Sequence, residues 1–230
     1  MTSTETPIRL GAPHTDDALS ESDPHPAGHA TYFTYTDSPV GPLMIAATAH
    51  GLRAIEFAEH RHPVPRTNEW VDISEHPYWR SERSANQDHA GNTGSHLGDS
   101  DLRAAIDLLT ATAAQLAEYF AGERRDFQIP LDPIGTDFQC QVWQGLQQIP
   151  YGQTWSYADL ARHIGNPKAV RAVGAANGRN PISIVVPCHR VIAADGTLGG
   201  YGGGLQRKTT LLRIEGHPIP ESAEGEGQLF

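Results

Sequence analysis

The chain has 230 residues, a formal net charge of -10 and only two cysteines, Cys140 and Cys188. This length allows one large domain or two small ones, and so few cysteines exclude a disulfide framework and a cysteine-rich zinc site. The first thirty residues contain no apolar segment typical of a signal peptide, and no run reaches the length of a membrane span. We therefore expect a cytoplasmic protein in a reducing environment, with no membrane partner.

Predicted strands open the ordered part of the chain. Residues 1–29 are polar and poor in large apolar groups, which is typical of a disordered tail. Alternating aromatic and polar residues then predict a strand at 31–36, and two further apolar runs predict strands at 43–49 and 52–58. Short turns that contain glycine separate the three runs. The pattern therefore predicts a small antiparallel meander.

A polar segment and a long helix follow the meander. Residues 81–100 are strongly polar, and we interpret them as a flexible insert. Nine of the twelve histidines precede residue 100 without acidic or cysteine partners at ligand spacing, so no metal site is expected. From Asp101 onward apolar residues recur at helical spacing, and Gly122 can cap the helix end. The apolar stripe consists of Leu102, Ile106, Leu109, Ala113, Leu116 and Phe120.

The second half of the chain contains a predicted helix-turn-helix. Residues 124–134 hold two prolines and are interpreted as a linker, and a capping-box pattern then begins a helix at 136–149. Two short helices are expected next, at 156–164 and 168–177, joined by a turn of Gly, Asn and Pro. Small side chains on the second helix would let its backbone approach a DNA groove. Short helix pairs also occur in many proteins that do not bind DNA, so both interpretations stay open.

The most reactive stretch of the sequence lies just before residue 190. The β-branched run 182–186 predicts a buried strand, and Pro187 ends it because proline cannot donate to a sheet ladder. Cys188, His189 and Arg190 therefore follow a strand end directly. A thiol becomes a nucleophile when a nearby base or positive charge lowers its pKa. A buried structural cysteine is the alternative, since cysteine is among the most buried residue types.

A glycine-rich loop and a final helix complete the chain. Five glycines lie within residues 199–204, which implies unusual backbone angles or a ligand against main-chain N–H groups; a flexible connector would show the same composition. The loop lacks the Lys-Ser/Thr ending of a phosphate-binding loop. A helix is predicted at 205–215 and an acidic tail at 217–230. Residues 131–218 carry eight basic and five acidic side chains, which predicts a basic working surface on an acidic protein.

The order of these motifs resembles that of the O6-alkylguanine-DNA alkyltransferases, also called methylated-DNA–protein-cysteine methyltransferases. The resemblance is strong over residues 131–216. It rests on the helix-turn-helix, the Gly-Arg-Asn-Pro motif at 178–181, the Ile-Val-Val-Pro-Cys-His-Arg-Val-Ile motif at 184–192 and the glycine-rich loop around Tyr201. The meander at 31–58, with its Ser-Pro-Val-Gly-Pro turn, looks like the start of the family's ribonuclease-H-like domain.

The resemblance implies an α+β protein of two domains. The N-terminal domain, residues 30–123, is expected to hold an antiparallel sheet of the ribonuclease-H type with one helix. The linker at 124–134 then leads to a mostly helical domain, residues 135–216, with the helix-turn-helix and a short active-site strand. The segments 1–29 and 217–230 are expected to be disordered.

The resemblance also implies catalytic and DNA-binding roles. Cys188 matches the alkyl-accepting nucleophile, and His189 matches the base that acts on it through a water. Glu215 matches the carboxylate that orients this histidine, and Asn180 matches the asparagine that braces the active-site turn. Arg171 looks like the residue that enters the base stack in place of the flipped nucleotide. The other expected DNA-binding residues are Lys168, Ala169 and Ala172.

Substrate contacts are implied in the same way. Tyr157 matches the tyrosine that contacts the extruded guanine, and the main-chain carbonyls of Cys188 and Val191 match acceptors for its exocyclic amine. Tyr201 and Gly202 belong to the loop expected to bind the base. Gly202 stands where some relatives have a serine, so its N–H remains to donate to the substrate O6 but a hydroxyl contact is absent.

These assignments predict DNA repair by direct reversal of damage. The alkyl group of O6-alkylguanine in double-stranded DNA would move to Cys188 after the nucleotide is flipped. The resulting thioether lacks a good leaving group, so each molecule acts once, with no cofactor and no metal. We expect a monomer associated with the nucleoid; repair of O4-alkylthymine and cooperative binding are left open.

Two other functions compete with this prediction. The first is a non-catalytic protein that binds alkyl lesions and signals damage; relatives of that type lack the active-site cysteine, which this chain retains. The second is a thiol hydrolase, which would leave the helix-turn-helix and Arg171 without a role. Alkyl transfer to Cys188 distinguishes the predicted function from both.

Overall fold

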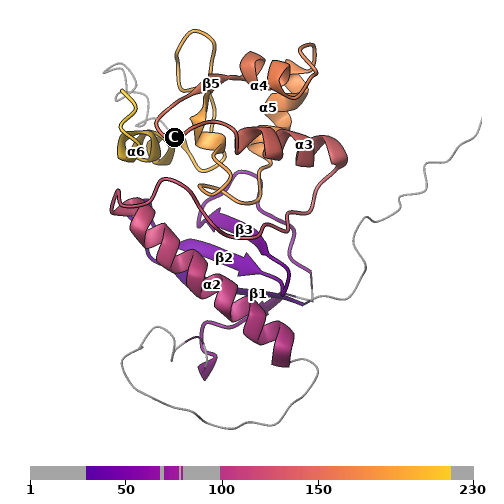
Figure 1. The fold of residues 1–230 in the computed structure, drawn as a ribbon, viewed down its shortest axis with the longest axis vertical. Coiled ribbons are helices and arrows are strands. Elements are labelled where there is room, and N and C mark those ends of the chain that lie inside the picture. The colour runs from indigo at the N-terminus through magenta and orange to yellow at the C-terminus, as the bar shows by residue number, and fades with distance from the viewer. Residues whose placement is uncertain (1–29, 68–69, 78, 80–98, 219–230) are drawn as a thin grey trace, which may run out of the picture.

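A computed structural model describes residues 30–67, 70–77, 79 and 99–218. The predicted tail at 1–29 lies outside the described residues, as do most of the 81–100 insert and of the tail at 217–230. Figure 1 shows a sheet crossed by one long helix in its lower part and the shorter helices in its upper part. No helix of the described part is long and apolar enough to cross a membrane.

The N-terminal sheet has four strands in the order β3-β2-β1-β4. Their bounds are Thr31–Thr36 for β1, Leu43–Ala47 for β2, Leu52–Phe57 for β3 and Trp70–Asp72 for β4. The first three pair antiparallel, which confirms the predicted meander. The fourth strand is an addition to it and pairs parallel with β1. A strand of three residues is too short to show the alternation of apolar and polar residues that predicts a strand, so β4 was not predicted from the sequence.

The long helix α2, Asp99–Phe120, packs across one face of this sheet (Figure 1). Its predicted apolar stripe faces the strands, and Ile106, Leu109 and Leu116 are buried there against Ile45 and other strand residues. Each of these side chains contributes about 2 kcal/mol through removal of apolar surface from water. The packing of one amphipathic helix on a half-buried sheet therefore supplies the N-terminal core.

The segment predicted as a linker runs along the edge of this sheet. The Leu52 N–H donates to the Pro130 carbonyl at 2.8 Å, and the Asp132 N–H donates to the Leu52 carbonyl at 2.8 Å. The Asp132 carboxylate also accepts from the Thr48 hydroxyl at 2.8 Å and pairs with Arg53. The connection between the two halves is thus fastened to β3.

The C-terminal half is mostly helical, and its helix-turn-helix confirms the prediction. The predicted capping box, Thr136 with Gln139, is present, and Ser156 with Asp159 forms a second one that was not predicted. The second helix of the motif begins later than predicted, because Pro167 and the next residue remain in the turn. The helices are α3 (Asp137–Leu146), α4 (Tyr157–His163), α5 (Val170–Gly178) and α6 (Leu205–Ile214), with the short strands β5 (Trp155–Ser156) and β6 (Val191–Ile192) and the 3-10 helix η1 (Cys188–Arg190). The α+β fold class is therefore confirmed.

The expected strand at 182–186 is wrong. Only Ile182 forms a bridge, with Ile55 of β3, and the chain then turns. The Val185 N–H donates to the Ser183 carbonyl at 2.9 Å around Ile184, whose φ of 73° lies in the left-handed region. A β-branched residue there costs on the order of 1–3 kcal/mol and persists only where its surroundings hold it. β-branched composition predicted a strand, but tertiary contacts impose a strained turn.

Candidate active site

Cys188 directly follows a second tight turn. Its N–H donates to the Val186 carbonyl at 2.8 Å around Pro187, whose φ of -82° and ψ of 63° are those of an inverse γ-turn. The thiol then stands at the first position of η1 and is buried, with 5% of the residue exposed. The two turns in succession place the sulfur below the surface instead of in a sheet.

Asn180 holds both turns and the thiol at once. Its Nδ2 donates to the Val186 carbonyl at 2.7 Å and to Cys188 Sγ at 3.1 Å, while its Oδ1 accepts from the Ile182 N–H at 3.1 Å. The side chain is buried, so these bonds are made away from water, where they matter most. These three hydrogen bonds join Asn180 to both turns, and they offset the strain at Ile184.

A buried carboxylate lies behind the thiol. The Glu215 side chain accepts two bonds from Arg190, Nε to Oε2 and Nη2 to Oε1, both at 2.9 Å, and its Oε1 lies 2.9 Å from His189 Nε2. Burial alone would raise the pKa of Glu215, but the bonds and charges of His189 and Arg190 outweigh it and lower the pKa to about 2. Glu215 is therefore ionised at neutral pH and paired with a permanent cation.

Two further groups complete the surroundings of Glu215. The Tyr119 hydroxyl donates to Oε1 at 2.9 Å, and the Gly152 N–H donates to Oε2 at 3.1 Å. Tyr119 belongs to α2, so the N-terminal half supports the site as well. Gly152 has a φ of 75°, and a Cβ there would lie 2.7 Å from the Glu215 carbonyl oxygen. The carboxylate is thus fixed from four directions and holds the His189 ring in place.

The thiol and the imidazole both rest in their neutral forms. Burial raises the pKa of Cys188, although Asn180, Tyr201 and Lys208 act in the opposite direction. Burial lowers the pKa of His189, although Glu215 acts in the opposite direction. His189 Nδ1 has no hydrogen-bond partner among the described residues and is free to accept a proton. The thiol therefore needs a proton acceptor before it can react as a thiolate.

A buried lysine lies beside these groups. Lys208 Nζ donates to the Val191 carbonyl at 2.6 Å and to the Leu198 carbonyl. Burial lowers its pKa to about 8, while Cys188 acts in the opposite direction. The Val191 carbonyl, expected to accept from the guanine amine, therefore already has one partner. A carbonyl oxygen has two lone pairs, so one remains for a substrate.

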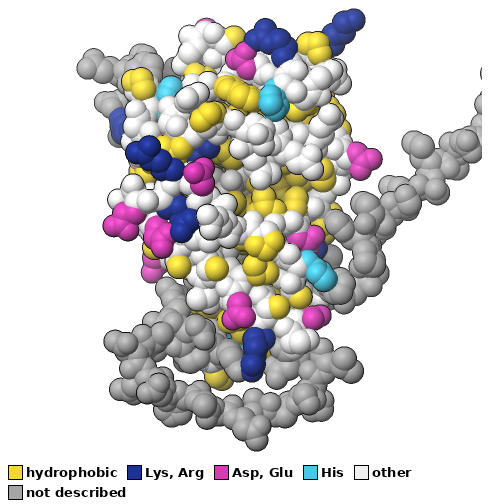
Figure 2. All heavy atoms as spheres, viewed as in Figure 1, with side chains coloured by type: hydrophobic (Ala, Val, Ile, Leu, Met, Phe, Trp, Pro, Cys, Tyr) yellow, Lys and Arg dark blue, Asp and Glu magenta, His cyan; other side chains and the backbone are white. Residues whose placement is uncertain are grey.

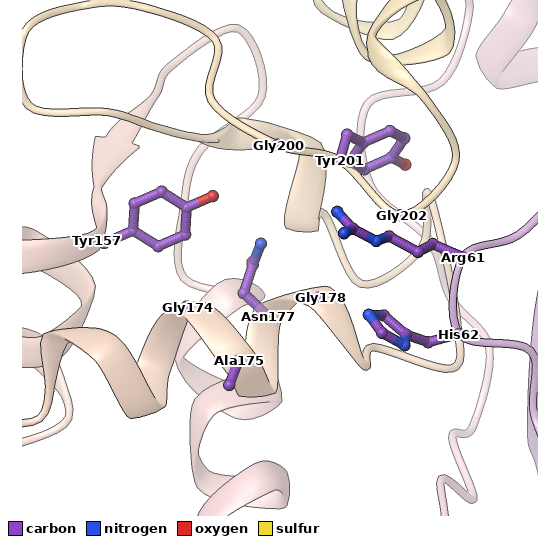
Figure 3. A pocket seen from close by; sticks show the side chains of 10 residues that line it. All are labelled: Arg61, His62, Tyr157, Gly174, Ala175, Asn177, Gly178, Gly200, Tyr201 and Gly202. Carbon is purple, nitrogen blue, oxygen red and sulfur yellow. The ribbon is translucent and has the colours of Figure 1, made fainter. Parts of the chain in front are cut away.

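A pocket of about 190 Å³ lies between the end of α5, the glycine-rich loop and the segment after β3, and Cys188 itself is not among the residues that line it (Figure 3). Tyr157, Tyr201 and Gly202, which were predicted to bind the substrate, line this pocket. The Tyr201 hydroxyl lies beside Cys188 without a hydrogen bond of regular geometry, so this residue joins the pocket to the thiol. Asn177 points into the space, and its buried Oδ1 lacks a partner among the described residues. A bound donor would satisfy this oxygen.

The predicted DNA-binding residues lie apart from the pocket. Lys168, Arg171 and Ala172 are exposed and Ala169 is half-buried, on the outer side of the helix-turn-helix. Trp143 of α3 anchors α5 from within, since its Nε1 donates to the Ala176 carbonyl at 2.9 Å. In Figure 2 most of the Lys and Arg side chains of the visible face lie over the upper, C-terminal half. No cluster of three or more His, Cys, Asp or Glu that could hold a metal occurs in the described ranges.

Family comparisons agree with this geometry. Residues 137–217 match the 6-O-methylguanine DNA methyltransferase DNA binding domain, and residues 31–133 match the ribonuclease-like domain of the same family. Together the two matches cover most of the chain. The chain belongs to this family.

Individual relatives extend the comparison. The methylated-DNA–protein-cysteine methyltransferase of Methanosarcina acetivorans is 40% identical over 80% of this chain and 98% of its own length. That of Mycobacterium leprae is 42% identical over 80% of this chain and 91% of its own length. The crystal structure of Mycobacterium tuberculosis OGT in complex with DNA is similar with a TM-score of 0.62 at 40% identity, covering 80% of this chain and 92% of that one.

Several residues of this family member's site were not predicted from the sequence. Arg190 was noted beside the cysteine, but its bidentate contact with Glu215 depends on a residue 25 positions away. In the sequence, Tyr119 and Lys208 look like ordinary helix residues. Only the structure shows that their side chains are buried and contact the site. Asn177, at the end of α5, and Arg61, after β3, likewise appear only once the pocket is seen. A signal existed for Asn177 alone, as a polar residue within an otherwise apolar helix face.

Proposed function

We propose that this member of the 6-O-methylguanine DNA methyltransferase family repairs O6-alkylguanine in DNA by moving the alkyl group to Cys188. The observation that carries the proposal is the Cys188 thiol held by Asn180 at 3.1 Å, next to a neutral His189 whose Nε2 faces Glu215. Cys140, in contrast, lies on α3 and donates its S–H to the Gly135 carbonyl at 3.7 Å, and burial and the Asp137 charge both raise its pKa. Only one of the two thiols therefore has the surroundings of a nucleophile.

Activation requires the thiol proton to leave a buried site. His189 Nδ1 is the free acceptor and takes the proton through a water, as the family resemblance implies. Glu215 stabilises the resulting imidazolium, because it already holds Nε2 at 2.9 Å and remains ionised. Arg190 keeps that carboxylate charged and in position. The thiolate is thus generated at the moment of reaction.

The transfer is a direct displacement at the alkyl carbon. The Cys188 sulfur forms the new S–C bond while the C–O6 bond breaks. The electron pair of the broken C–O6 bond leaves with guanine and is delocalised over its ring. The guanine anion then takes up one proton and becomes neutral guanine. The thiol has released one proton, so the numbers of protons released and taken up are equal. Tyr157, in the pocket, donates from its hydroxyl toward the charge that develops on the base. The thioether product is stable, so one molecule repairs one lesion.

The lesion reaches the pocket by nucleotide flipping. The exposed side of α5 carries small residues, which permit close approach to a DNA groove, and Arg171 projects from it as the residue that fills the vacated stack. Unstacking a base costs a few kcal/mol, and the inserted side chain offsets part of it. Lys168, Ala169 and Ala172 contact the same duplex. The Cys188 and Val191 carbonyls and the Gly202 N–H contact the base.

Mass spectrometry of the Cys188 peptide tests the proposal. Incubation with a duplex that contains one O6-methylguanine should add the mass of one methylene to this peptide, up to one equivalent per protein molecule. A duplex with unmodified guanine serves as the control. Methylation of Cys140, or tight lesion binding without any transfer, would contradict the proposal, and the second result would favour a damage-signalling protein.

A further inference from the structure

The N-terminal half supplies one wall of the pocket. Arg61 and His62 follow β3, and their side chains point into the pocket toward Asn177 (Figure 3). The remaining wall belongs to the C-terminal half, from α5 and the glycine-rich loop. A base held in this pocket would therefore lie between the two halves of the molecule.

Several contacts hold this wall in place. The Arg61 N–H donates to the Gly202 carbonyl at 2.9 Å, which joins the segment to the glycine-rich loop. Phe57 stacks against His60 with a centroid distance of 6.3 Å, and a Cβ on Gly203 would lie 2.5 Å from the Phe57 ring. The loop must therefore be glycine here to pack so closely. The backbone of Arg61 is therefore held against the glycine-rich loop.

The charge at this wall is not neutralised. None of the residues that line the pocket is acidic. The Arg61 guanidinium is exposed and makes no ion pair or hydrogen bond with any described residue, in a chain whose formal net charge is -10. Arg66, five residues on, contrasts with it because that guanidinium lies near Glu56 and over the Phe33 ring. An unpaired guanidinium at a pocket mouth is suited to an anion from outside the chain.

We propose that Arg61 binds a backbone phosphate of DNA beside the flipped nucleotide. The inference rests on the proposed function, since the base that enters the pocket leaves its flanking phosphates at the mouth. A guanidinium has planar, bidentate donors that match the oxygens of a phosphate. It also attracts the phosphate electrostatically, and added salt weakens this attraction. The N-terminal half thus takes a direct part in DNA binding.

Salt dependence of binding tests this contact. Each protein is prepared with Cys188→Ser, so that a duplex containing O6-methylguanine is bound without reaction, and affinity is measured from low to high salt. Arg61→Ala should weaken binding about tenfold at 0.1 M salt and reduce the slope of log K against log salt by about one. Arg61→Lys should keep most of the slope. An unchanged slope in Arg61→Ala would overturn the proposal.

A neutral phosphate identifies the partner. Duplexes carry a single methylphosphonate at each position flanking the lesion in turn. At one of these positions the methylphosphonate should weaken DNA binding by the protein that retains Arg61. It should leave the affinity of Arg61→Ala unchanged, because that variant has already lost the contact. A defect of Arg61→Ala that persists undiminished on every such duplex would show that the residue acts on the base or on pocket shape, and would overturn the proposal.

Two controls separate this test from other failures. Arg124→Ala removes one positive charge from an arginine already paired with Glu118, and should leave affinity within about twofold. Thermal unfolding of Arg61→Ala checks that the exposed substitution leaves the fold intact. The chain with Cys188 intact is tested for methyl transfer to the same duplex; absence of transfer would refute the proposed function, while the salt slopes would still report on Arg61.

Discussion

The two halves of the molecule bury polar groups in different ways. Among the described residues, the N-terminal half buries four threonines and one charged side chain, Glu56, within an apolar core. The C-terminal half buries His189, Arg190, Lys208 and Glu215, with asparagines and hydroxyls around them. Buried ionisable groups contribute little net stability, because desolvation opposes their attraction. Their concentration on one side therefore marks where the molecule prepares a reaction, while the sheet supplies the stability.

The largest contrast is expected between the two cysteines. Cys188→Ala should abolish methyl uptake from a lesion duplex, because it removes the acceptor, whereas Cys140→Ala should leave the rate within about twofold, since surface and half-buried substitutions away from the site change little. Transfer of labelled methyl to protein measures both. Residual uptake by Cys188→Ala would mean that the polar cluster does not mark the acceptor.

Glu215→Ala should destabilise the protein by about 4 kcal/mol, because it leaves the Arg190 charge buried and unpaired. It should also slow methyl transfer, since His189 loses the group that holds Nε2. Urea unfolding gives the first effect, and single-turnover kinetics at a temperature where the variant is folded gives the second. A variant that is unstable but reacts at the normal rate would limit Glu215 to a structural role.

Ile45→Ala is the matching change in the sheet. Ile45 is fully buried under α2, so the cavity should cost about 3 kcal/mol of unfolding free energy. Methyl transfer by the folded fraction should stay unchanged, because β2 packs mainly against β1, β3 and α2. If Ile45→Ala slowed methyl transfer as much as Glu215→Ala does, the distinction between a stabilising half and a reacting half would not hold.

Acid should act through the C-terminal cluster. The pKa of Glu215 is lowered from 4.5 to about 2, so its contribution is present above pH 4.5 and is lost as pH falls toward 2, by about 3 kcal/mol in total. The lowered pKa of His189 acts in the same direction, since the unfolded chain takes up a proton first as pH falls below about 6.5. The acid dependence of urea unfolding should therefore be weaker in Glu215→Gln than in the unchanged protein.

The smallest effect is expected at the exposed ion pair of α2. Glu118 lies 2.6 Å from Arg124, but its side chain is 44% exposed, so Glu118→Ala should cost at most about 0.5 kcal/mol. Urea unfolding of this variant calibrates the larger losses. A cost comparable with that of Glu215→Ala would show that burial does not separate the two carboxylates.

Local patterns were enough to predict much of this protein. The meander, the stripe of α2, the capping box at Thr136 and the helix-turn-helix follow from periods of two and 3.6 residues and from short polar motifs, all of which act between near neighbours in the chain. The reactive cysteine was also recognisable, because Pro187, Cys188, His189 and Arg190 are adjacent. The domain bounds and the roles given to individual site residues remain predictions.

Tertiary structure decided the conformation and surroundings of that cysteine. Residues 182–186 have strand composition, yet Asn180 and the bridge to Ile55 hold them in turns, with Ile184 left-handed. Glu215 receives bonds from Tyr119 and Gly152, which lie 96 and 63 positions away. Arg61 enters the pocket only because β3 packs beside the glycine-rich loop. Such contacts join segments distant in the sequence, and their energies depend on burial, which no local pattern reports.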